Sequence, residues 1–424
     1  MPADHHRIID YLAEFTRDGG KIEQLRARLK PRLDGMPPKM LGRARISPKI
    51  VEQRWQRLNA PNEIRVALDA GMTPGGMECY QHNIENFIGT VKTPVGLAGP
   101  LRVNGLFAQG DYYVPLATTE AALVASYSRG AQLITEAGGA TAIVLNEGVG
   151  RGPAFVFDTL ESACLFAAWA ASQIEEFRRA VETTTRHGRL LDIRVAVEGN
   201  HVFLHLEFST GDAAGQNMAT FATDAICRHI EKRAPVQPRK YFIEANFSGD
   251  KKASALSFLG VRGKKISAEV IVPRTLVEQR LRTTPADLMR YWQMAAVGGI
   301  MSGTIGVQGH FANGLAALYL ACGQDVACVA ESAVGITRFE CTDEGSLYAS
   351  VTLPNVIVGT VGGGTRLPSQ NACLRVMGLE GAGHARALAE VCAALCLAGE
   401  LSICGALCAG DFARAHMRLA RPKA

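Results

Sequence analysis

Residues 193–218 read IRVAVEGNHVFLHLEFSTGDAAGQNM, and this stretch contains the pattern that decides the fold class. Apolar residues alternate over 193–197 and 202–208, which is typical of two strands, and Gly199-Asn200 between them suits a tight hairpin turn. Apolar residues then recur at steps of three and four from Met218 to Ile230, as in a helix, and 241–247 is a further strand candidate. Two strands, a helix and a strand predict a small α+β module.

The rest of the chain suggests that this module, at 155–243, is inserted in a larger domain formed by 76–154 and 244–395. Residues 1–75 are charged and broken by prolines, which predicts a helical N-terminal segment, and 396–424 are expected to form a C-terminal helical flap. Tyr291 to Gln324 contains no charged residue and is long enough for a membrane span. Its glycines and polar residues favour a helix buried at the centre of the large domain instead.

Composition excludes several classes of protein. The 424 residues are 47% apolar and 20% charged, close to the globular average. A formal net charge of +5 is too small over this length to imply a nucleic-acid or membrane surface. Eleven cysteines without secreted-domain spacing indicate reduced thiols, and no apolar signal segment is evident, so a cytoplasmic location is expected. Cys392, Cys396, Cys404 and Cys408 share a helical face and are expected to be buried hydrophobes rather than metal ligands.

Two glycine loops and two acids are candidates for chemistry. No GxGxxG follows a strand, so an ordinary Rossmann domain has little support. Residues 211–218 and 359–365 expose bare backbone that could approach a pyrophosphate, although a helix cap and an ordinary loop are equally simple interpretations. Glu120 and Asp325 are each isolated in apolar sequence, and a buried carboxylate needs a partner. Lys251 is the natural partner for both acids, and the alternative interpretation is a purely structural salt bridge. Lys264-Lys265 is expected to be solvated.

Seven motifs, in their order and spacing, resemble those of 3-hydroxy-3-methylglutaryl-CoA (HMG-CoA) reductases. They are Glu85–Gly89, Pro94–Leu101, Ala117–Glu120, Gly211–Met218, Asp250–Lys252, Gly323–Asp325 and Gly359–Thr365. The resemblance covers residues 76 to 417 and is to the class I branch, which uses NADPH. It implies an α+β fold with a large domain around a buried central helix, an inserted ferredoxin-like NADPH-binding domain, and at least a homodimer. No membrane anchor, metal or nucleic acid is expected.

The resemblance also implies a reaction, in which a thioester is reduced in two hydride steps to a primary alcohol and the thiol is released. Lys251 matches the lysine that stabilises the oxyanion, and Glu120 matches the acid that protonates the alcohol. Asp325 matches the aspartate that links these two, and His416 matches the histidine that protonates the departing thiolate. HMG-CoA to mevalonate is the expected reaction. The alternatives are another acyl-CoA or carrier-protein thioester and a non-catalytic thioester- or nucleotide-binding homologue.

Binding residues are implied in the same way. The residues expected to bind NADPH are Thr185, Arg186, Asp212, Ala214, Gly215, Gln216, Asn217, Gly362 and Gly363. The residues expected to bind the substrate are Ser126, Arg129, Arg151, Glu244, Asp250, Lys252, His310 and Asn313.

Four positions depart from the family pattern. Ser128 and Gln132 stand where the family has Asn and Arg for CoA, Glu244 replaces a Ser of the acyl pocket, and the Lys expected near Met294 is absent. A carboxylate gained and a cation lost both disfavour an anionic acyl group. Weakened binding of HMG-CoA is therefore expected, and a cationic acyl group is an alternative.

Overall fold

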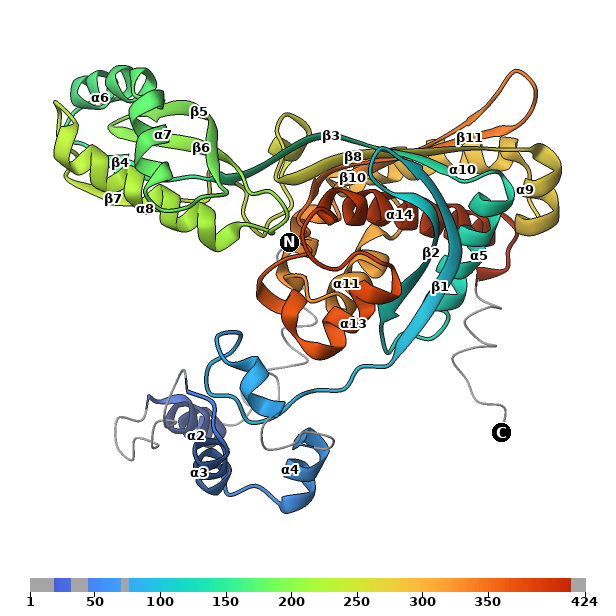
Figure 1. Cartoon of the computed structure of the whole chain (residues 1–424), viewed down its shortest axis with the longest axis horizontal. Helices are drawn as coiled ribbons and strands as arrows, with labels where there is room; N and C mark the ends of the chain where they lie inside the picture. Colours follow the sequence, from blue (N-terminus) through green and yellow to red (C-terminus); the bar gives the residue numbers. More distant parts are fainter. Residues whose placement is uncertain (1–18, 32–44, 70–75, 413–424) are drawn as a thin grey trace. The chain divides into compact units, whose positions relative to one another are not determined.

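The computed structural model describes residues 19–31, 45–69 and 76–412, and the chain divides into two compact units between Thr90 and Val91 (Figure 1). The first unit contains α2 (Gly19–Leu29), α3 (Pro48–Leu58), α4 (Asn62–Asp69) and η1 (Gly76–Tyr80). Arg54 and Trp55 of α3 donate to the carbonyl oxygens of Phe87 and Ile88 at 2.8 and 3.0 Å. These bonds hold residues up to 90 in this unit, beyond the end at residue 75 expected from the sequence.

The second unit is built on a mixed sheet in the order β3-β8-β11-β10-β9, with β1 and β2 beyond β3. β3 pairs in parallel with β1 and antiparallel with β8, and β9 is parallel to β10. The strands are β1 (Val95–Gly105), β2 (Gln109–Ala117), β3 (Ala140–Arg151), β8 (Gly263–Val272), β9 (Gly306–Val307), β10 (Gly335–Cys341) and β11 (Leu347–Val356). The α+β class expected from the sequence is confirmed.

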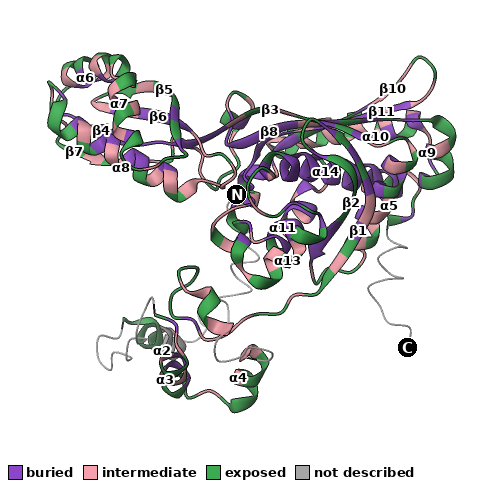
Figure 2. Cartoon of the chain, in the orientation of Figure 1, coloured by how far each residue is buried: buried purple, intermediate pink, exposed green. Residues whose placement is uncertain are grey.

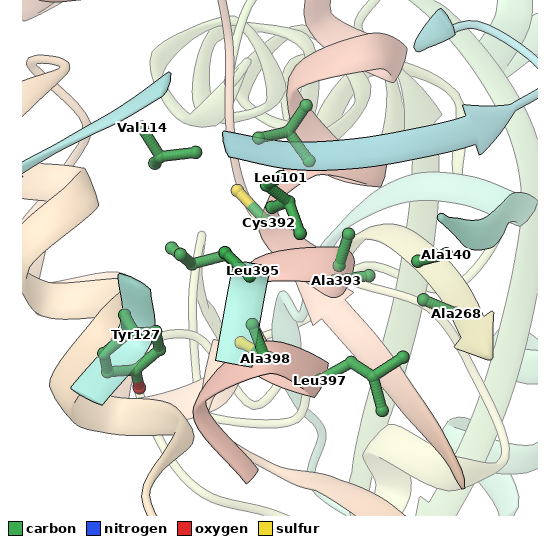
Figure 3. Packing of buried hydrophobic residues seen from close by; sticks show 14 of the residues in the cluster. Leu101, Val114, Tyr127, Ala140, Ala268, Cys392, Ala393, Leu395, Leu397 and Ala398 are labelled. Atoms are coloured by element: carbon green, nitrogen blue, oxygen red, sulfur yellow. The ribbon is translucent and has the colours of Figure 1, made fainter. Parts of the chain in front are cut away.

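Helix α14 (Ala385–Cys408) is the centre of the large core, and apolar side chains of β1, β2, β3 and β8 gather around it (Figure 3). Buried residues follow it along its length (Figure 2). Cys392, Cys396 and Cys404 are among them, as expected from the sequence, whereas Cys408 at the end of the helix is only partly buried. The helix continues through residue 396, where the sequence suggested a domain boundary. Helices α5 (Leu123–Glu136), α9 (Arg274–Leu281), α12 (Val329–Ser332) and α13 (Pro368–Val376) complete this part, together with η2 (Ala255–Phe258) and η4 (Gly363–Arg366).

The uncharged run from 291 to 324 is not the central helix, and that prediction is wrong. It is divided between α10 (Pro285–Ser302), β9 and α11 (Phe311–Ala321). Gly303 and Gly306 have φ of +73° and +91°, which end α10 and start β9. Met294, Val297, Ile300 and Met301 of α10 are 56–84% exposed. Within the described chain, α14 alone is long and apolar enough to cross a bilayer, but 83% of its most apolar window is buried, as in core helices of soluble proteins.

The end of β3 leads into a smaller module with its own core of phenylalanine and aliphatic side chains. Its strands run in the order β7-β4-β6, with the end of β3 and with β5 also paired to β6. The elements are β4 (Ala154–Val156), β5 (Arg189–Glu198), β6 (His201–Ser209), β7 (Lys240–Phe242), α6 (Leu160–Ser172), α7 (Ile174–Glu182) and α8 (Gln216–Arg233). The predicted hairpin and helix are confirmed. The strand predicted over 241–247 ends at Phe242, because the chain turns there toward 249–252.

Gly130 of α5 tests the packing of this helix on α14. A Cβ at this position would lie 1.8 Å from the carbonyl oxygen of Ala398. We predict that Gly130→Ala lowers the free energy of unfolding by at least about 2 kcal/mol, because the backbone of α14 has to move. Urea unfolding followed by circular dichroism measures this. Gly298→Ala in α10, where nothing lies within 4 Å, is the control. Equal effects of the two substitutions would contradict the packing.

Candidate active site

Lys251 lies in a tight turn and directs its ammonium at Asp325. Its backbone has φ +55°, and Gly249 has φ +70°, so the chain reverses sharply here. Lys251 Nζ lies 2.9 Å from Asp325 Oδ2. The hydrogen bond to Asp325 raises the pKa of Lys251, and it outweighs the opposing effect of partial burial. The ammonium is therefore charged throughout the neutral range.

Asp325 follows α11 and caps η3 (Val326–Cys328) through a 3.1 Å bond from Ala327 N–H. Gln216, the first residue of α8, donates to Asp325 Oδ2 at 3.2 Å. Partial burial alone would raise the pKa of Asp325, but the hydrogen bond and charge of Lys251 hold it below the usual value. The ion pair expected between Lys251 and Asp325 is present.

A neighbouring acid, Asp250, is held by two guanidinium groups. Arg151 Nη1 lies 2.9 Å from one carboxylate oxygen, and Arg262 Nη2 binds the other. Arg262 is 3% exposed, and it also donates to Gly150 O at 2.8 Å and to Glu331 Oε1 at 3.2 Å. The turn that carries Lys251 is therefore fixed to the core through the neighbouring Asp250. We call Arg151, Asp250, Lys251, Arg262 and Asp325 the lysine cluster.

Glu244 lies beside this cluster. Its Oε2 accepts hydrogen bonds from Gly152 N–H at 3.0 Å and from the Ser248 hydroxyl at 2.9 Å. The same oxygen is 3.9 Å from Arg151 Nη1. Its Oε1 is buried and has no hydrogen-bond partner among the residues described. Glu244 is thus held against the backbone through Oε2, and its other oxygen is available to a further donor. The nearby guanidinium of Arg151 is already bound to Asp250.

A second group of candidate residues surrounds a cavity of about 310 Å³, which we call the acid cavity. It is lined by Glu120, Ser126, Arg129, His310 and Asn313, together with Tyr127 and Ile403. Glu120 was expected to be buried, but it is exposed, because it follows β2 at the rim of the cavity. Asn313 Nδ2 donates to its carboxylate at 3.4 Å.

Ser402 of α14 fixes the wall of the acid cavity. It is fully buried, and its hydroxyl is 2.9 Å from Ser126 Oγ and 3.1 Å from Arg129 Nε. Arg129 Nη2 also donates to the Ser402 carbonyl oxygen at 2.5 Å. Ser128, one of the departures from the family pattern, instead contacts Gly99. The two expected CoA contacts are therefore pre-positioned by one serine.

The lysine cluster and the acid cavity lie at opposite ends of α11. Asn313, which contacts Glu120, is in the first turn of this helix, and Asp325 follows its last residue, Ala321. The eight steps along the helix from residue 313 to residue 321 alone rise about 12 Å. Lys251 was expected to pair with both acids, but among the described residues it forms an ion pair only with Asp325.

The two glycine loops lie against each other at the N-terminus of α8. A Cβ on Gly359 would be 2.5 Å from Ala214 N, so only glycine allows this approach. Gly362 and Gly363 have φ of +76° and +52°, and nothing lies within 4 Å of their Cβ positions. The loops therefore form a bare backbone surface beside the helix start, which is the kind of surface that binds phosphate groups in other proteins.

The side chains of several predicted cofactor residues have other partners in this structure. Asp212 accepts hydrogen bonds from Gly383 and Ala385 N–H, at 2.8 and 3.2 Å. The Thr185 hydroxyl contacts the Met218 sulfur at 3.2 Å, whereas Arg186 is exposed. Ala214, Gly215 and Asn217 lie at or beside the start of α8.

Two further predicted residues remain. Lys252, expected to bind the substrate, donates from Nζ to Asp250 O at 2.9 Å. His416, expected to protonate the thiolate, lies outside the described residues.

Sequence reasoning missed Arg262, Glu331 and Glu400, all of which are buried. Glu400 is an isolated acid in an apolar helix, which is the signal that singled out Glu120 and Asp325. Lys264 was expected to be solvated, but it is 3% exposed and contacts Val358 O at 3.3 Å. Burial lowers the pKa of Lys264. Its position on the inner strand β8 explains the difference.

Comparison with known proteins identifies relatives over most of the chain. Residues 51–421 match the family model for hydroxymethylglutaryl-coenzyme A reductase. The 3-hydroxy-3-methylglutaryl-coenzyme A reductase of Aeropyrum pernix is 45% identical over 350 residues, which cover 81% of this chain and 83% of that protein. The enzyme of the same name from Pyrococcus abyssi is 43% identical over 352 residues, covering 81% and 86%.

A solved structure shares the fold. The class II 3-hydroxy-3-methylglutaryl-CoA reductase from Streptococcus pneumoniae, bound to NADPH in open conformations, has a TM-score of 0.64 and 21% sequence identity. The match covers 86% of this chain and 97% of that one.

Arg262 is the residue that tests the lysine cluster. We predict that Arg262→Leu lowers the free energy of unfolding by about 3–5 kcal/mol, because it leaves Glu331 without its buried counter-ion and leaves Asp250 with Arg151 alone. Urea denaturation measures the change. Arg274→Leu, which removes an exposed pair with Glu278, is the control and should change stability little. If the Arg262 variant were as stable as this control, the clamp on Asp250 would be unimportant.

Proposed function

The chain belongs to the hydroxymethylglutaryl-coenzyme A reductase family, and from that premise we propose that it reduces HMG-CoA to mevalonate with two equivalents of NADPH. The observation that carries the proposal is the Lys251–Asp325 ion pair, 2.9 Å long, which Gln216 connects to the start of α8. The pair keeps the Lys251 ammonium charged beside the two glycine loops, which suit the phosphates of a dinucleotide.

The loops support NADPH as the reductant. The bare backbone at Gly359, Gly362 and Gly363 and the start of α8 would hold the pyrophosphate, and the exposed Arg186 is available to the 2′-phosphate. When bound, NADPH supplies the hydride that reduces the carbonyl carbon.

Lys251 acts on the carbonyl oxygen, which becomes negative twice during the four-electron reduction. An ammonium fixed by Asp325 needs no reorganisation as that charge develops. The first reduction gives a hemithioacetal, which breaks its C–S bond to yield an aldehyde and a thiolate, and the second gives the alcohol. Two protons are consumed, one by the thiolate and one by the alcohol. We assign these to His416 and Glu120, respectively.

We propose that the enzyme is a homodimer and that each active site combines the acid cavity of one protomer with the lysine cluster of its partner. Glu120 and Lys251 lie at opposite ends of α11, so one chain does not bring them together. The exposed apolar stripe on α10, formed by Met294, Val297, Ile300 and Met301, offers a surface for a second copy. The eleven free cysteines support a reducing, cytoplasmic location.

The primary test measures NADPH oxidation and thiol release by the purified protein with HMG-CoA and with a panel of other CoA and carrier-protein thioesters. We expect activity with HMG-CoA, and Lys251→Ala should lower kcat by about 10²–10³ while NADPH still binds. Activity with another thioester alone would favour the alternative substrate. NADPH or CoA binding without oxidation of NADPH would favour the non-catalytic homologue.

Mixing two inactive variants tests the shared site. In a dimer of Glu120→Gln with Lys251→Ala, one site contains both substitutions and the other contains neither. Random exchange of protomers is therefore expected to restore about a quarter of wild-type activity. Each variant mixed with itself is the control. If the mixture stayed inactive although exchange was confirmed by mass spectrometry, both residues would serve the same chain's site.

Glu244 tests the identity of the acyl group. We predict that Glu244→Ser lowers the KM for HMG-CoA several-fold, because it removes a negative charge beside Arg151, the cation expected to meet the terminal carboxylate. Steady-state kinetics at saturating NADPH measure this. Glu207→Gln, on β6, is the control, because it also removes one negative charge. A KM that is unchanged or higher would show that Glu244 does not face the acyl group.

A further inference from the structure

Glu400 is a fully buried acid whose carboxylate faces His310. It lies on α14, and its oxygens accept hydrogen bonds from Gly309 N–H at 2.7 Å, His310 N–H at 2.8 Å and the Thr337 hydroxyl at 2.7 Å. No Lys or Arg among the described residues forms an ion pair with it. In the described part of the chain, the one ionisable base within 4 Å of its carboxylate is the His310 imidazole, whose Nδ1 is 3.5 Å from Glu400 Oε1.

The His310 ring is also fixed on its other sides. It stacks on Tyr127 with the ring centroids 5.0 Å apart and an interplanar angle of 16°. The Tyr127 hydroxyl donates to the His310 carbonyl oxygen at 3.1 Å. Gly399 makes this packing possible, because a Cβ there would lie 2.9 Å from His310 Cε1 and 2.5 Å from Tyr127 Cε1. The ring therefore has one orientation, in which it lines the acid cavity.

Nδ1 of His310 is buried and has no hydrogen-bond partner in the described structure. A proton on Nδ1 can be shared only with Glu400, whereas a lone pair on Nδ1 would face a carboxylate without a counter-ion. We propose that Glu400 is a positioning residue for His310, which holds the proton on Nδ1 and leaves Nε2 as the nitrogen available to the acid cavity. The proposal rests on the proposed function in taking this cavity as the thioester site.

The fixed tautomer determines what His310 can do. Nε2 accepts a hydrogen bond from a donor in the cavity when the imidazole is neutral, and it presents a proton when the imidazole is charged. If the proton were on Nε2 instead, the neutral ring would present a hydrogen-bond donor to the acid cavity. A bound thioester would thus meet an acceptor in a defined position, which lowers the reorganisation needed during turnover.

Glu390 provides a matched control. It lies on the same helix and is equally buried, and its oxygens accept hydrogen bonds from Leu106, Phe107 and Ala108 N–H at 2.7–3.2 Å. No histidine among the residues that the structure describes pairs with Glu390. An amide at either position sets an NH₂ group against a backbone N–H, so Glu400→Gln and Glu390→Gln carry a similar structural defect. Only Glu400→Gln changes the group that faces an imidazole.

The test observes the ring nitrogens of ¹⁵N-histidine-labelled protein by NMR, with the His310 signals assigned by His310→Gln. We expect the Nδ1–H form in the wild type and in Glu390→Gln, and the Nε2–H form in Glu400→Gln. An Nε2–H wild type overturns the proposal even if Glu400→Gln fails to fold. The measurement needs no substrate, so its outcome is separate from that of the proposed reaction.

Kinetics provide the second readout. We expect Glu400→Gln to lower kcat/KM for the thioester by about 10–100-fold relative to Glu390→Gln, with the KM for NADPH unchanged. Equal losses in the two variants would show that Glu400 only stabilises the fold, and they would overturn the proposal.

Discussion

The contact of Asp250 with two guanidinium groups is the constraint on which the lysine cluster depends. Lys251 adopts a left-handed backbone conformation, which a lysine keeps only where its surroundings enforce it. Arg151 and Arg262 bind the carboxylate of the preceding residue from two sides, and Arg262 is itself held by Glu331 and Gly150. The turn is therefore tied to the end of β3 and to the core, and the Lys251 ammonium reaches Asp325.

Helix α14 plays the corresponding role for the acid cavity. Ser402 holds Ser126 and Arg129, and Glu400 holds the backbone that carries His310. Burying a carboxylate is costly unless it accepts several hydrogen bonds, and each of the two acids on this helix, Glu390 and Glu400, accepts three. The cavity wall is thus built from polar groups whose partners are already fixed. Such preorganisation is what a site needs if charge is to develop on its ligand.

Local patterns predicted much of the fold and the motifs predicted the Lys251–Asp325 pair, but contacts between distant segments were not predictable. The hairpin at 193–208 follows from alternation and a glycine turn, both of which are local. Residues 291–324 look alike in composition, and only their tertiary partners separate an exposed α10 from a buried α11. The burial of Lys264 depends on its strand lying inside the sheet. The distance between Glu120 and Lys251 likewise depends on where α11 runs.

Titration of the Lys251 side chain is the most direct test of this account. Its ¹⁵Nζ resonance, assigned by Lys251→Arg and followed from neutral to strongly alkaline pH, reports the pKa of that one ammonium. The account predicts a pKa above that of an ordinary lysine, because the hydrogen bond and charge of Asp325 outweigh partial burial, and a lower pKa in Asp325→Asn. A wild-type pKa at or below the ordinary value, unaffected by Asp325→Asn, would contradict the claim that the turn holds Lys251 against Asp325.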